Sequence, residues 1–379
     1  MNILFIEREF MPTLGGVERV TYTLGERLRK DGHNTYYAFY GRDDSELAID
    51  FKFHFDINWT DDKLYKSLKD YINTKNINII VCQNIHIPRF QYLYKRLKTD
   101  TNIKIITCLH CNPDIWVNKN KFGCTFSNIY FKELLRSIYF KVIKNPYKVN
   151  QKGMYDLSDK YILLSESFKK IFCKLNAVDG NKLYAIPNPC PFKDNYNIET
   201  TKENIVLVVS RMAEQQKRIS NIIKIWKLVS YKFPDWRLVF VGDGPNLNRY
   251  KHLSQKLGLE RVNFVGKSNN PQQYYMKAKI FLMTSIWEGF AMTLIEAQHY
   301  GCVPIAYDSY SAVHDIIKNE ENGYIIPLHN QNMFAEKLCF LIRNQNLWKE
   351  MSDSAKLNSN ALYNEDHIIN LWSKLFTNL

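Results

Sequence analysis

The stretch KIFLMTSIWEGFAMTLIEAQHYG, residues 279–301, places an apolar run directly before a segment with helical periodicity. The apolar run has the length of a buried strand and ends near Thr284. We expect the helix to begin between Ala291 and Thr293, so that a short loop joins the strand to the helix. This junction is typical of parallel α/β folds, in which a helix connects each strand to the next.

The same alternation of apolar runs and helical stretches continues along the whole chain. The expected strands are residues 2–6, 34–40, 77–83, 103–109, 160–165, 204–210, 237–242, 262–266, 279–285 and 302–308. After about residue 333 the pattern is helical to the end. The sequence therefore predicts an α/β chain with two Rossmann-like, doubly wound domains, whose cleft lies at the carboxyl ends of the strands.

A break in this pattern falls at residues 185–204, AIPNPCPFKDNYNIETTKEN. Its prolines and its polar, Asn-rich tail can continue neither a helix nor a strand, which indicates a linker. We therefore expect an N-terminal domain over residues 1–190, a second domain over 200–360 and a final helix over 361–379. A chain of 379 residues has room for two domains of ordinary size.

Composition argues against several classes of protein. The content of 45% hydrophobic and 23% charged residues is typical of a globular protein. Glu7, Arg8 and Glu9 follow a short apolar run, which is not the pattern of a secretory signal, and no apolar run approaches the ~18 residues of a membrane span. The eight cysteines are therefore expected to be reduced thiols in a cytosolic protein. Cys108 and Cys111 lack a second ligand pair, so core packing is preferred to a metal site.

Positive charge is unevenly spread in a chain whose formal net charge is +13. In residues 119–152 the single acid, Glu133, is surrounded by Lys119, Lys121, Lys132, Arg136, Lys141, Lys144, Lys148 and Lys152. Such a patch favours a polyanionic partner, either nucleic acid or an anionic membrane. Within it, Tyr130–Lys144 has the apolar and basic spacing of an amphipathic helix that could lie on a membrane. A core-packed helix with a solvated basic face would show the same spacing.

Glu288 and Glu296 are separated by seven residues around the start of the expected helix. Carboxylates accept hydrogen bonds from sugar hydroxyls, and the free amides at a helix start attract an anion. The arrangement suits a ligand with two polyhydroxyl ends and an anionic middle. A helix with one N-terminal acid and one solvated acid would have the same spacing.

Other candidate residues also follow expected strands. Arg211 and Lys217 offer fixed positive charge for a diphosphate, or they are ordinary surface charges. Gly15 and Gly16 would let the backbone approach a phosphate, or they form a plain turn. His110 follows a buried strand and is expected to face the cleft, although a lone histidine is more often structural.

The segment EGFAMTLIEA (288–297) resembles the E-x7-E motif of retaining glycosyltransferases, specifically glycosyltransferase family 4 with the GT-B fold. Three other stretches resemble the donor domain of that family, in order and spacing: VLVVSRMAEQQKRISNIIKIW (206–226), VFVGDGPNLNRY (239–250) and NFVGKS (263–268). The first half is similar more loosely, through GGVERV (15–20) and the strand ending in His110. The resemblance implies that residues 1–190 bind the acceptor, that 200–360 bind a nucleotide sugar, and that the final helix crosses back to the first domain.

The resemblance also implies roles for single residues. The donor-binding residues would be Gly15, Gly16, Arg211, Lys217, Gly266, Lys267, Glu288, Gly289, Phe290 and Glu296, and the catalytic residues would be His110, Arg211, Lys217 and Glu288. Arg211 and Lys217 would hold the diphosphate, Glu288 the sugar and Glu296 the ribose, with His110 near the reacting carbon. The chain departs from the family at Arg218, where many relatives have Gly, and at residues 308–313, where many have Gly-Gly-x-Pro-Glu.

The expected activity is therefore retaining transfer of a hexosyl or N-acetylhexosaminyl group from a nucleotide diphosphate sugar, by default a UDP-sugar. The expected acceptor is a glycan, lipid-linked, in bacterial capsule, O-antigen or exopolysaccharide synthesis. No Asp-x-Asp motif is present, so we expect no catalytic metal and no cofactor. The enzyme would be cytoplasmic, peripherally bound to the inner face of the cytoplasmic membrane.

Two alternatives stay open. A UDP-sugar epimerase of GT-B-like fold would bind the same donor and would interconvert it without an acceptor. A basic nucleic-acid-binding protein would explain the net charge but would give the E-x7-E helix no task.

Overall fold

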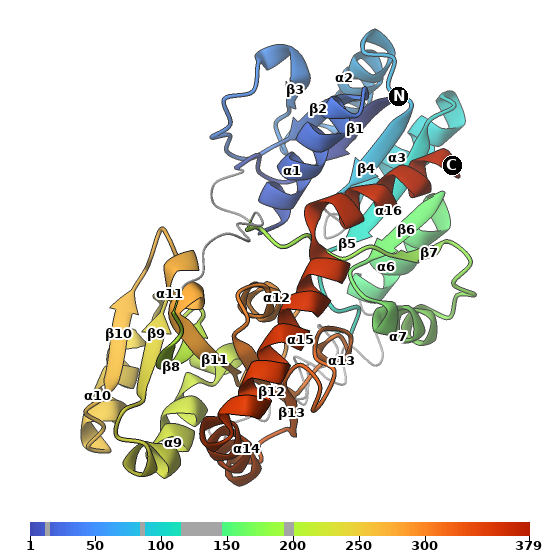
Figure 1. Ribbon diagram of the computed structural model, residues 1–379. Helices are drawn as coiled ribbons and strands as arrows, with labels where there is room; N and C mark the ends of the chain where they lie inside the picture. Colours follow the sequence, from blue (N-terminus) through green and yellow to red (C-terminus); the bar gives the residue numbers. More distant parts are fainter. Residues whose placement is uncertain (12–15, 84–87, 115–145, 193–200) are drawn as a thin grey trace. The chain divides into compact units, whose positions relative to one another are not determined.

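The computed structural model describes residues 1–379 except for 12–15, 84–87, 115–145 and 193–200, and the chain divides into two compact units (Figure 1). Among the described residues, the first unit holds those up to Asn188 together with Ile368–Leu379, and the second holds those within Pro189–His367. Each unit is built around a parallel sheet. The predicted α/β class with two Rossmann-like domains is thereby confirmed.

The sheet of the first unit has the strand order β3-β2-β1-β4-β5-β6-β7, and every described pairing in it is parallel. Its strands are β1 (Asn2–Ile6), β2 (Asn34–Phe39), β3 (Lys52–His54), β4 (Ile79–Cys82), β5 (Lys104–Leu109), β6 (Lys160–Leu163) and β7 (Leu183–Ala185). The helical elements between them are α1 (Gly16–Lys30), η1 (Ile49–Phe51), α2 (Asp61–Thr74), α3 (Arg89–Asp100), α6 (Pro146–Leu157) and α7 (Glu166–Asn176).

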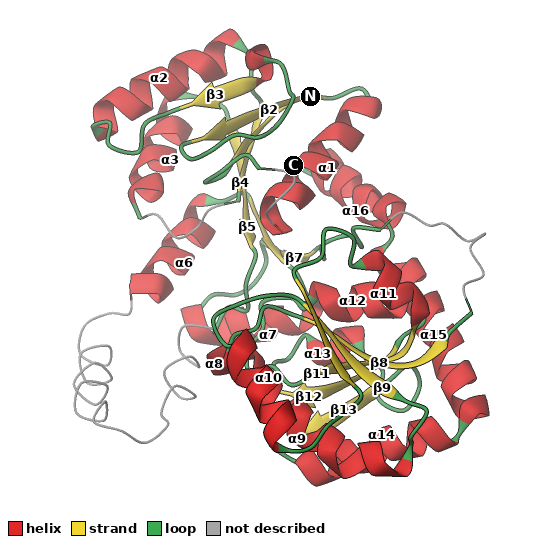
Figure 2. Cartoon of the chain, turned by 90° about the vertical axis from the view of Figure 1, so that its left-hand side faces the viewer, coloured by secondary structure: helices red, strands yellow, loops and turns green. Residues whose placement is uncertain are grey.

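The sheet of the second unit has the order β10-β9-β8-β11-β12-β13, again with parallel pairing. Its strands are β8 (Glu203–Val209), β9 (Arg237–Val241), β10 (Val262–Gly266), β11 (Ala278–Met283), β12 (Val303–Asp308) and β13 (Tyr324–Pro327). The helices are α8 (Glu214–Lys217), α9 (Ile219–Val229), η2 (Ser230–Lys232), α10 (Leu247–Lys256), α11 (Gln272–Lys277), α12 (Met292–His299), α13 (Val313–Ile316), α14 (Gln331–Arg343) and α15 (Gln345–Tyr363). Helices cover both faces of this sheet (Figure 2).

Central strands are apolar throughout because both faces of each sheet are covered. All four residues of β4 are buried, as are the central residues of β8 and β11. Helix α9 turns Ile222, Ile225 and Trp226, all fully buried, toward the core of the second unit. Continuous apolar runs of strand length are expected for strands that are buried on both faces.

The last helix, α16 (Glu365–Thr377), belongs for most of its length to the first unit. Ile368, Trp372 and Phe376 are buried in the same core cluster as Ile3 and Val81 of the first sheet. A fully buried side chain of this size contributes ~1.5–3 kcal/mol, so the helix is a substantial part of that core. The first unit is therefore assembled from two separate stretches of the chain.

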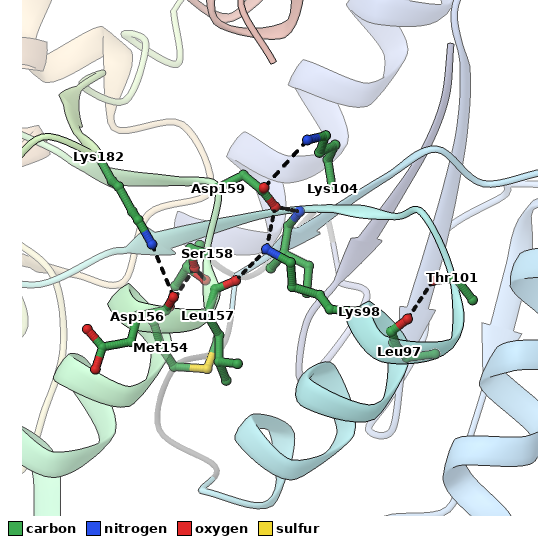
Figure 3. A network of polar contacts seen from close by, with 12 residues as sticks. Leu97, Lys98, Thr101, Lys104, Met154, Asp156, Leu157, Ser158, Asp159 and Lys182 are labelled. Atoms are coloured by element: carbon green, nitrogen blue, oxygen red, sulfur yellow. Dashed lines mark hydrogen bonds and ion pairs between the residues drawn. The ribbon is translucent and has the colours of Figure 1, made fainter.

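Asp159, at the start of β6, holds several elements of the first unit together (Figure 3). Its carboxylate accepts the backbone N–H of Ile105 at 2.8 Å and the Nζ of Lys98 at 3.0 Å, and Lys104 lies 3.7 Å away. Burial acts to raise the pKa of Asp159, but the hydrogen bonds and the two lysines outweigh it, and the pKa is lowered. The carboxylate thus stays ionised where α3, β5 and β6 meet.

The amphipathic stretch 130–144 and most of the basic patch lie outside the described residues. Of the helices that the structure does describe, none combines the length and the apolarity of a membrane-spanning segment.

Candidate functional site

In the second unit the strand order reverses between β8 and β11, which pair with each other while β9 and β12 lie on either side. Ligands of doubly wound sheets bind beside such a switch point, at the carboxyl ends of the strands. The loop after β8 carries Arg211 and leads to Lys217, and the loop after β11 carries Glu288. The fold therefore brings together three of the residues that the sequence singled out.

Lys217 and Glu288 form an ion pair, with Lys217 Nζ donating to Glu288 Oε1 at 2.5 Å. Their side chains are 19% and 10% exposed, so the pair is largely shielded from water. Gln216 strengthens the link, since its Nε2 donates to the Trp287 carbonyl at 3.1 Å and to Glu288 Oε2 at 3.4 Å. Gln216 was not predicted, because its contacts are with residues about seventy positions away in the chain.

The turn after Lys217 is fixed by Thr284, whose hydroxyl lies 3.1 Å from the carbonyl oxygen of Lys217 and 2.9 Å from that of Arg218. Arg218 adopts a φ of 49°, a left-handed conformation that favours glycine. Glycine at position 218 would therefore adopt this turn with less strain than arginine does.

Arg211 is exposed, and in the part of the chain that the structure describes its guanidinium takes part in no hydrogen bond or ion pair. The backbone beside it is held by the turn at residues 242–245: Met212 N donates to the Asp243 carbonyl at 2.9 Å. Gly242 has a φ of 132°, and a Cβ there would lie 2.0 Å from the Ser210 carbonyl oxygen. Glycine is therefore required at position 242 for the loop that carries Arg211 to pack closely.

Glu296 lies within α12 and is 8% exposed. Its Oε2 accepts a hydrogen bond of 2.8 Å from the hydroxyl of Tyr275. At the start of the helix Gly289 is half-buried, and Phe290 is buried with its ring edge-on to Tyr363 at 6.0 Å between ring centroids. No side chain caps α12 at Ala291, so its first amides lack that kind of partner.

Gly266 is the last residue of β10 and Lys267 follows it, two strands away from the switch point. Gly266 adopts a φ of 82°, and its carbonyl oxygen accepts the N–H of Gly242 at 2.7 Å. Lys267 is exposed. The recorded contacts of the described residues do not connect Lys267 with the Lys217–Glu288 pair.

The loop after β12 also packs against the candidate site. Ser309 Oγ donates to the Ser285 carbonyl at 2.7 Å, which joins this loop to the one that follows β11. Tyr310 is buried, and burial together with the charge of Glu288 raises the pKa of its hydroxyl. Residues 308–313, where the chain departs from the family pattern, therefore lie beside Glu288.

In the first unit the strand order reverses between β1 and β4. His110 follows β5, and its Nε2 lies 2.5 Å from Oε1 of Gln83, which follows β4. Because an amide oxygen only accepts, the proton of this bond belongs to Nε2. Gln83 was not predicted.

The two glycines predicted near the donor phosphates are only partly described. Gly15 lies outside the described residues. Gly16 begins α1, and an added Cβ there would meet no atom within 4 Å, so packing does not demand glycine at that position.

Glu7 follows β1 and is 2% exposed, although its charged neighbours in sequence suggest a polar surface. Neither of its carboxyl oxygens has a hydrogen-bond partner among the described residues. Burial, and then the charge of Glu18, raise its pKa well above the usual range, with a smaller opposing effect from the Thr21 hydroxyl. Glu7 is thus a buried acid at the carboxyl edge of the first sheet, where burial disfavours its charged form.

Cys108 and Cys111 are the two cysteines of the first unit that the sequence raised as metal ligands. Cys108 packs in the core of the first unit, and burial raises the pKa of Cys111 to about 12. Within the described ranges, His, Cys, Asp and Glu side chains form no group of three or more that could hold a metal ion.

Comparison with known proteins shows two family matches. Residues 14–192 match the model described as Glycosyltransferase Family 4, and residues 192–358 match the one described as Glycosyl transferases group 1. An uncharacterized glycosyltransferase of Haemophilus influenzae is 26% identical over 364 residues, covering 94% of this chain and 95% of its own length.

Two relatives have more specific names. The amylovoran biosynthesis glycosyltransferase AmsD of Erwinia amylovora is 29% identical over 58% of this chain and 63% of its own length. The Campylobacter jejuni GalNAc-alpha-(1->4)-GalNAc-alpha-(1->3)-diNAcBac-PP-undecaprenol alpha-1,4-N-acetyl-D-galactosaminyltransferase is 27% identical over 50% of this chain and 52% of its own length. The match thus spans less than two thirds of each of these two relatives.

Solved structures share the fold along the whole chain. The lipopolysaccharide outer core galactosyltransferase WaaB superposes with a TM-score of 0.75 at 19% identity and full coverage of both chains. Anabaena Alr3699/HepE in complex with UDP gives 0.75 at 16% identity, also with full coverage.

Proposed function

Since the chain belongs to glycosyltransferase family 4 with the GT-B fold, we propose that it catalyses retaining transfer of a hexosyl or N-acetylhexosaminyl group from a UDP-sugar to a glycan acceptor. Its homologues include glycosyltransferases of bacterial polysaccharide and lipid-linked glycan synthesis. The observation that carries the proposal is the Lys217–Glu288 pair at the switch point of the second sheet, with Arg211 on the loop that leads from β8 to Lys217.

The leaving group of such a reaction is a nucleoside diphosphate, whose negative charge grows in the transition state. Fixed cations placed where that charge develops lower the barrier. Lys217 has three N–H donors, so one can stay with Glu288 while the others reach a phosphate oxygen. The guanidinium of Arg211 can bind a phosphate with two parallel hydrogen bonds. Glu288, held by Lys217 and Gln216, is in turn oriented to accept hydrogen bonds from sugar hydroxyls.

Retention is proposed to follow from attack on the face that the diphosphate leaves. The bond between the anomeric carbon and the phosphate oxygen breaks, and a bond to the acceptor oxygen forms on the same face. The acceptor proton passes to a phosphate oxygen, so no protein nucleophile is needed. Arg211 and Lys217 supply the charge compensation, and we propose that neither a metal ion nor a cofactor takes part.

UDP as the nucleotide is supported by relatives of the same fold. The structure of Anabaena Alr3699/HepE is a complex with UDP, and a Staphylococcus aureus TarM structure also contains UDP. For the first unit we propose acceptor binding, with His110 and Gly16 near the carboxyl ends of its strands. The sugars named for relatives and structural neighbours include galactose, glucose, N-acetylgalactosamine and N-acetylglucosamine, which agrees with a hexosyl or N-acetylhexosaminyl donor here.

We further propose a lipid-linked acceptor and a cytoplasmic enzyme held at the inner face of the membrane, in capsule, O-antigen or exopolysaccharide synthesis. The name of the Campylobacter jejuni relative contains an undecaprenol-diphosphate-linked glycan. The basic and aromatic residues of 119–152 provide the charge and the apolar side chains for an anionic membrane surface.

The proposal is tested first with the donor. A panel of nucleotide sugars is screened by thermal shift, and the stabilising ones are incubated with lipid-linked glycan acceptors while product mass is followed. A product heavier than the acceptor by one hexosyl or N-acetylhexosaminyl residue is expected. Interconversion of the donor without an acceptor would indicate an epimerase instead, and stabilisation by no nucleotide sugar would refute the proposed activity.

A further inference from the structure

Tyr275 is fully buried in α11, and its hydroxyl donates to Glu296 Oε2 at 2.8 Å. The two residues lie on different helices, α11 and α12, on either side of β11 in sequence. Burial, and then the charge of Glu296, raise the pKa of Tyr275 well above its usual range. The phenol is therefore a neutral, permanent hydrogen-bond donor to this carboxylate.

The backbone of Tyr275 is itself anchored to the sheet. Its carbonyl oxygen accepts hydrogen bonds from the Nζ of the half-buried Lys202 at 2.9 Å and from the Sγ of Cys302 at 3.0 Å. Lys202 also donates to the carbonyl of Ala278, the first residue of β11, at 2.8 Å. Residues beside three strands of the second sheet thus fix where α11 ends, and with it the position of the phenol.

The ring of Tyr275 is enclosed by other aromatic rings. Its centroid lies 5.9 Å from that of Phe281, 6.1 Å from that of Phe192 and 6.4 Å from that of Tyr300. A ring packed this closely cannot swing away from Glu296 without disturbing the core. The hydroxyl is therefore presented to Glu296 in one orientation.

We propose that Tyr275 is a positioning residue for donor binding, which orients the Glu296 carboxylate toward the ribose hydroxyls of the nucleotide. The inference rests on the proposed function, in which Glu296 binds the ribose. A carboxylate in a buried site is held by the donors around it, and the loss of one leaves it misdirected and less well solvated. Tyr275 touches neither the sugar nor the diphosphate in this assignment, so it is not a catalytic residue.

The test compares Tyr275→Phe with the wild-type protein in binding UDP and 2′,3′-dideoxy-UDP by calorimetry. Phe keeps the ring and its packing and removes only the hydroxyl. We expect UDP affinity to fall about five- to tenfold, the equivalent of one hydrogen bond, while affinity for the dideoxy analogue stays unchanged. Tyr274→Phe, the same change at the neighbouring position of α11, is the matched control and should bind both ligands as the wild type does.

Three results would overturn the inference, each in a distinguishable way. Unchanged UDP affinity in Tyr275→Phe would show that the hydroxyl does not matter. An equal loss of affinity for UDP and for the dideoxy analogue would show that the substitution disturbs the whole site, or the fold, and does not act through the ribose. Failure of the wild-type protein to bind UDP would refute the nucleotide of the proposed function, and the inference with it.

Discussion

Lys217 Nζ and Glu288 Oε1 lie 2.5 Å apart although the two residues follow different strands: Lys217 ends α8, after β8, and Glu288 lies in the loop after β11. In the proposed mechanism each has its own ligand group, the diphosphate for Lys217 and the sugar for Glu288. Their pairing before the donor arrives keeps both side chains in place and keeps a buried charge from standing alone. When the donor binds, its diphosphate and sugar add hydrogen-bond partners to an ion pair that has already formed.

Glu288→Gln keeps the size of the side chain and removes its charge, so we expect the fold to be retained and transfer to be strongly reduced. The loss in transition-state stabilisation should be ~2–4 kcal/mol, measured as the change in kcat/KM. Glu336→Gln, a change at an exposed position of α14, is the control. A near-normal rate in Glu288→Gln would remove this residue from the mechanism.

Arg211→Ala should reduce kcat/KM by a comparable ~2–4 kcal/mol, because a fixed cation for the leaving diphosphate is lost. The melting temperature should hardly change, since Arg211 is exposed and has no ion pair among the described residues. Arg249→Ala, at an exposed position of α10, removes the same charge elsewhere in the second unit. If both variants transfer sugar equally well, Arg211 does not bind the donor.

Treatment with EDTA should leave the transfer rate largely intact, because Arg211 and Lys217 provide the charge that a divalent cation supplies in metal-dependent enzymes. The measurement is the initial rate before and after chelation and gel filtration. Loss of activity that manganese or magnesium restores would show that the reaction needs a metal ion.

Glu7→Gln should stabilise the protein at about pH 8 and have little effect near pH 4. The pKa of Glu7 is raised in the folded chain. Its contribution to stability is therefore complete below the unfolded pKa, roughly 4.3, and is lost as pH rises toward the folded pKa. Glutamine cannot ionise and avoids that loss, which is about 1.4 kcal/mol for each unit of pKa shift.

Calorimetric melting temperatures of the wild type and Glu7→Gln across this pH range give the measurement, with the exposed Glu46→Gln as the control. If the difference in melting temperature between wild type and Glu7→Gln does not grow with pH, the pKa of Glu7 is not raised in the folded chain.

Membrane attachment is tested by co-sedimentation with liposomes that contain anionic lipid. Each basic residue near such a surface is worth ~1 kcal/mol at most, so four Lys/Arg→Gln changes at Lys132, Arg136, Lys141 and Lys144 should release the protein at low salt. The matched control changes four exposed lysines of the second unit: Lys224, Lys251, Lys256 and Lys349. If both variants bind the liposomes equally well, the membrane contact lies elsewhere on the protein. If the wild-type protein does not bind them, membrane attachment is refuted.

The strands that the sequence predicted are all present, with ends that differ by no more than two residues. Their long apolar runs reflect burial on both faces, which is a local and continuous signal. The strands that were missed are β3, β7 and β13, and each lies at the edge of its sheet and is short. KFH, LYA and YIIP are too brief to show a pattern, so only their pairing with a neighbour identifies them.

The candidate site was less accessible to prediction. The sequence places Glu288 at a strand-to-helix junction, where the structure also has it, but it does not reveal the partners of Glu288, Glu296 and His110. Gln83 beside His110, Gln216 beside Glu288 and Tyr275 beside Glu296 are each joined to residues far away in sequence. A hydrogen bond of this kind has no periodicity, and it becomes visible only when the sheet order is known.

The return of α16 to the first unit has a consequence for biosynthesis. Ile368, Trp372 and Phe376 complete a core whose other members begin at Ile3, and the whole of the second unit is encoded between them. Domains normally fold in the order in which the ribosome makes them. Because α16 is made last, we expect the first unit to keep an apolar face uncovered until the second has been translated. The earlier domain is therefore finished last, and nascent chains should depend on chaperones until α16 has emerged.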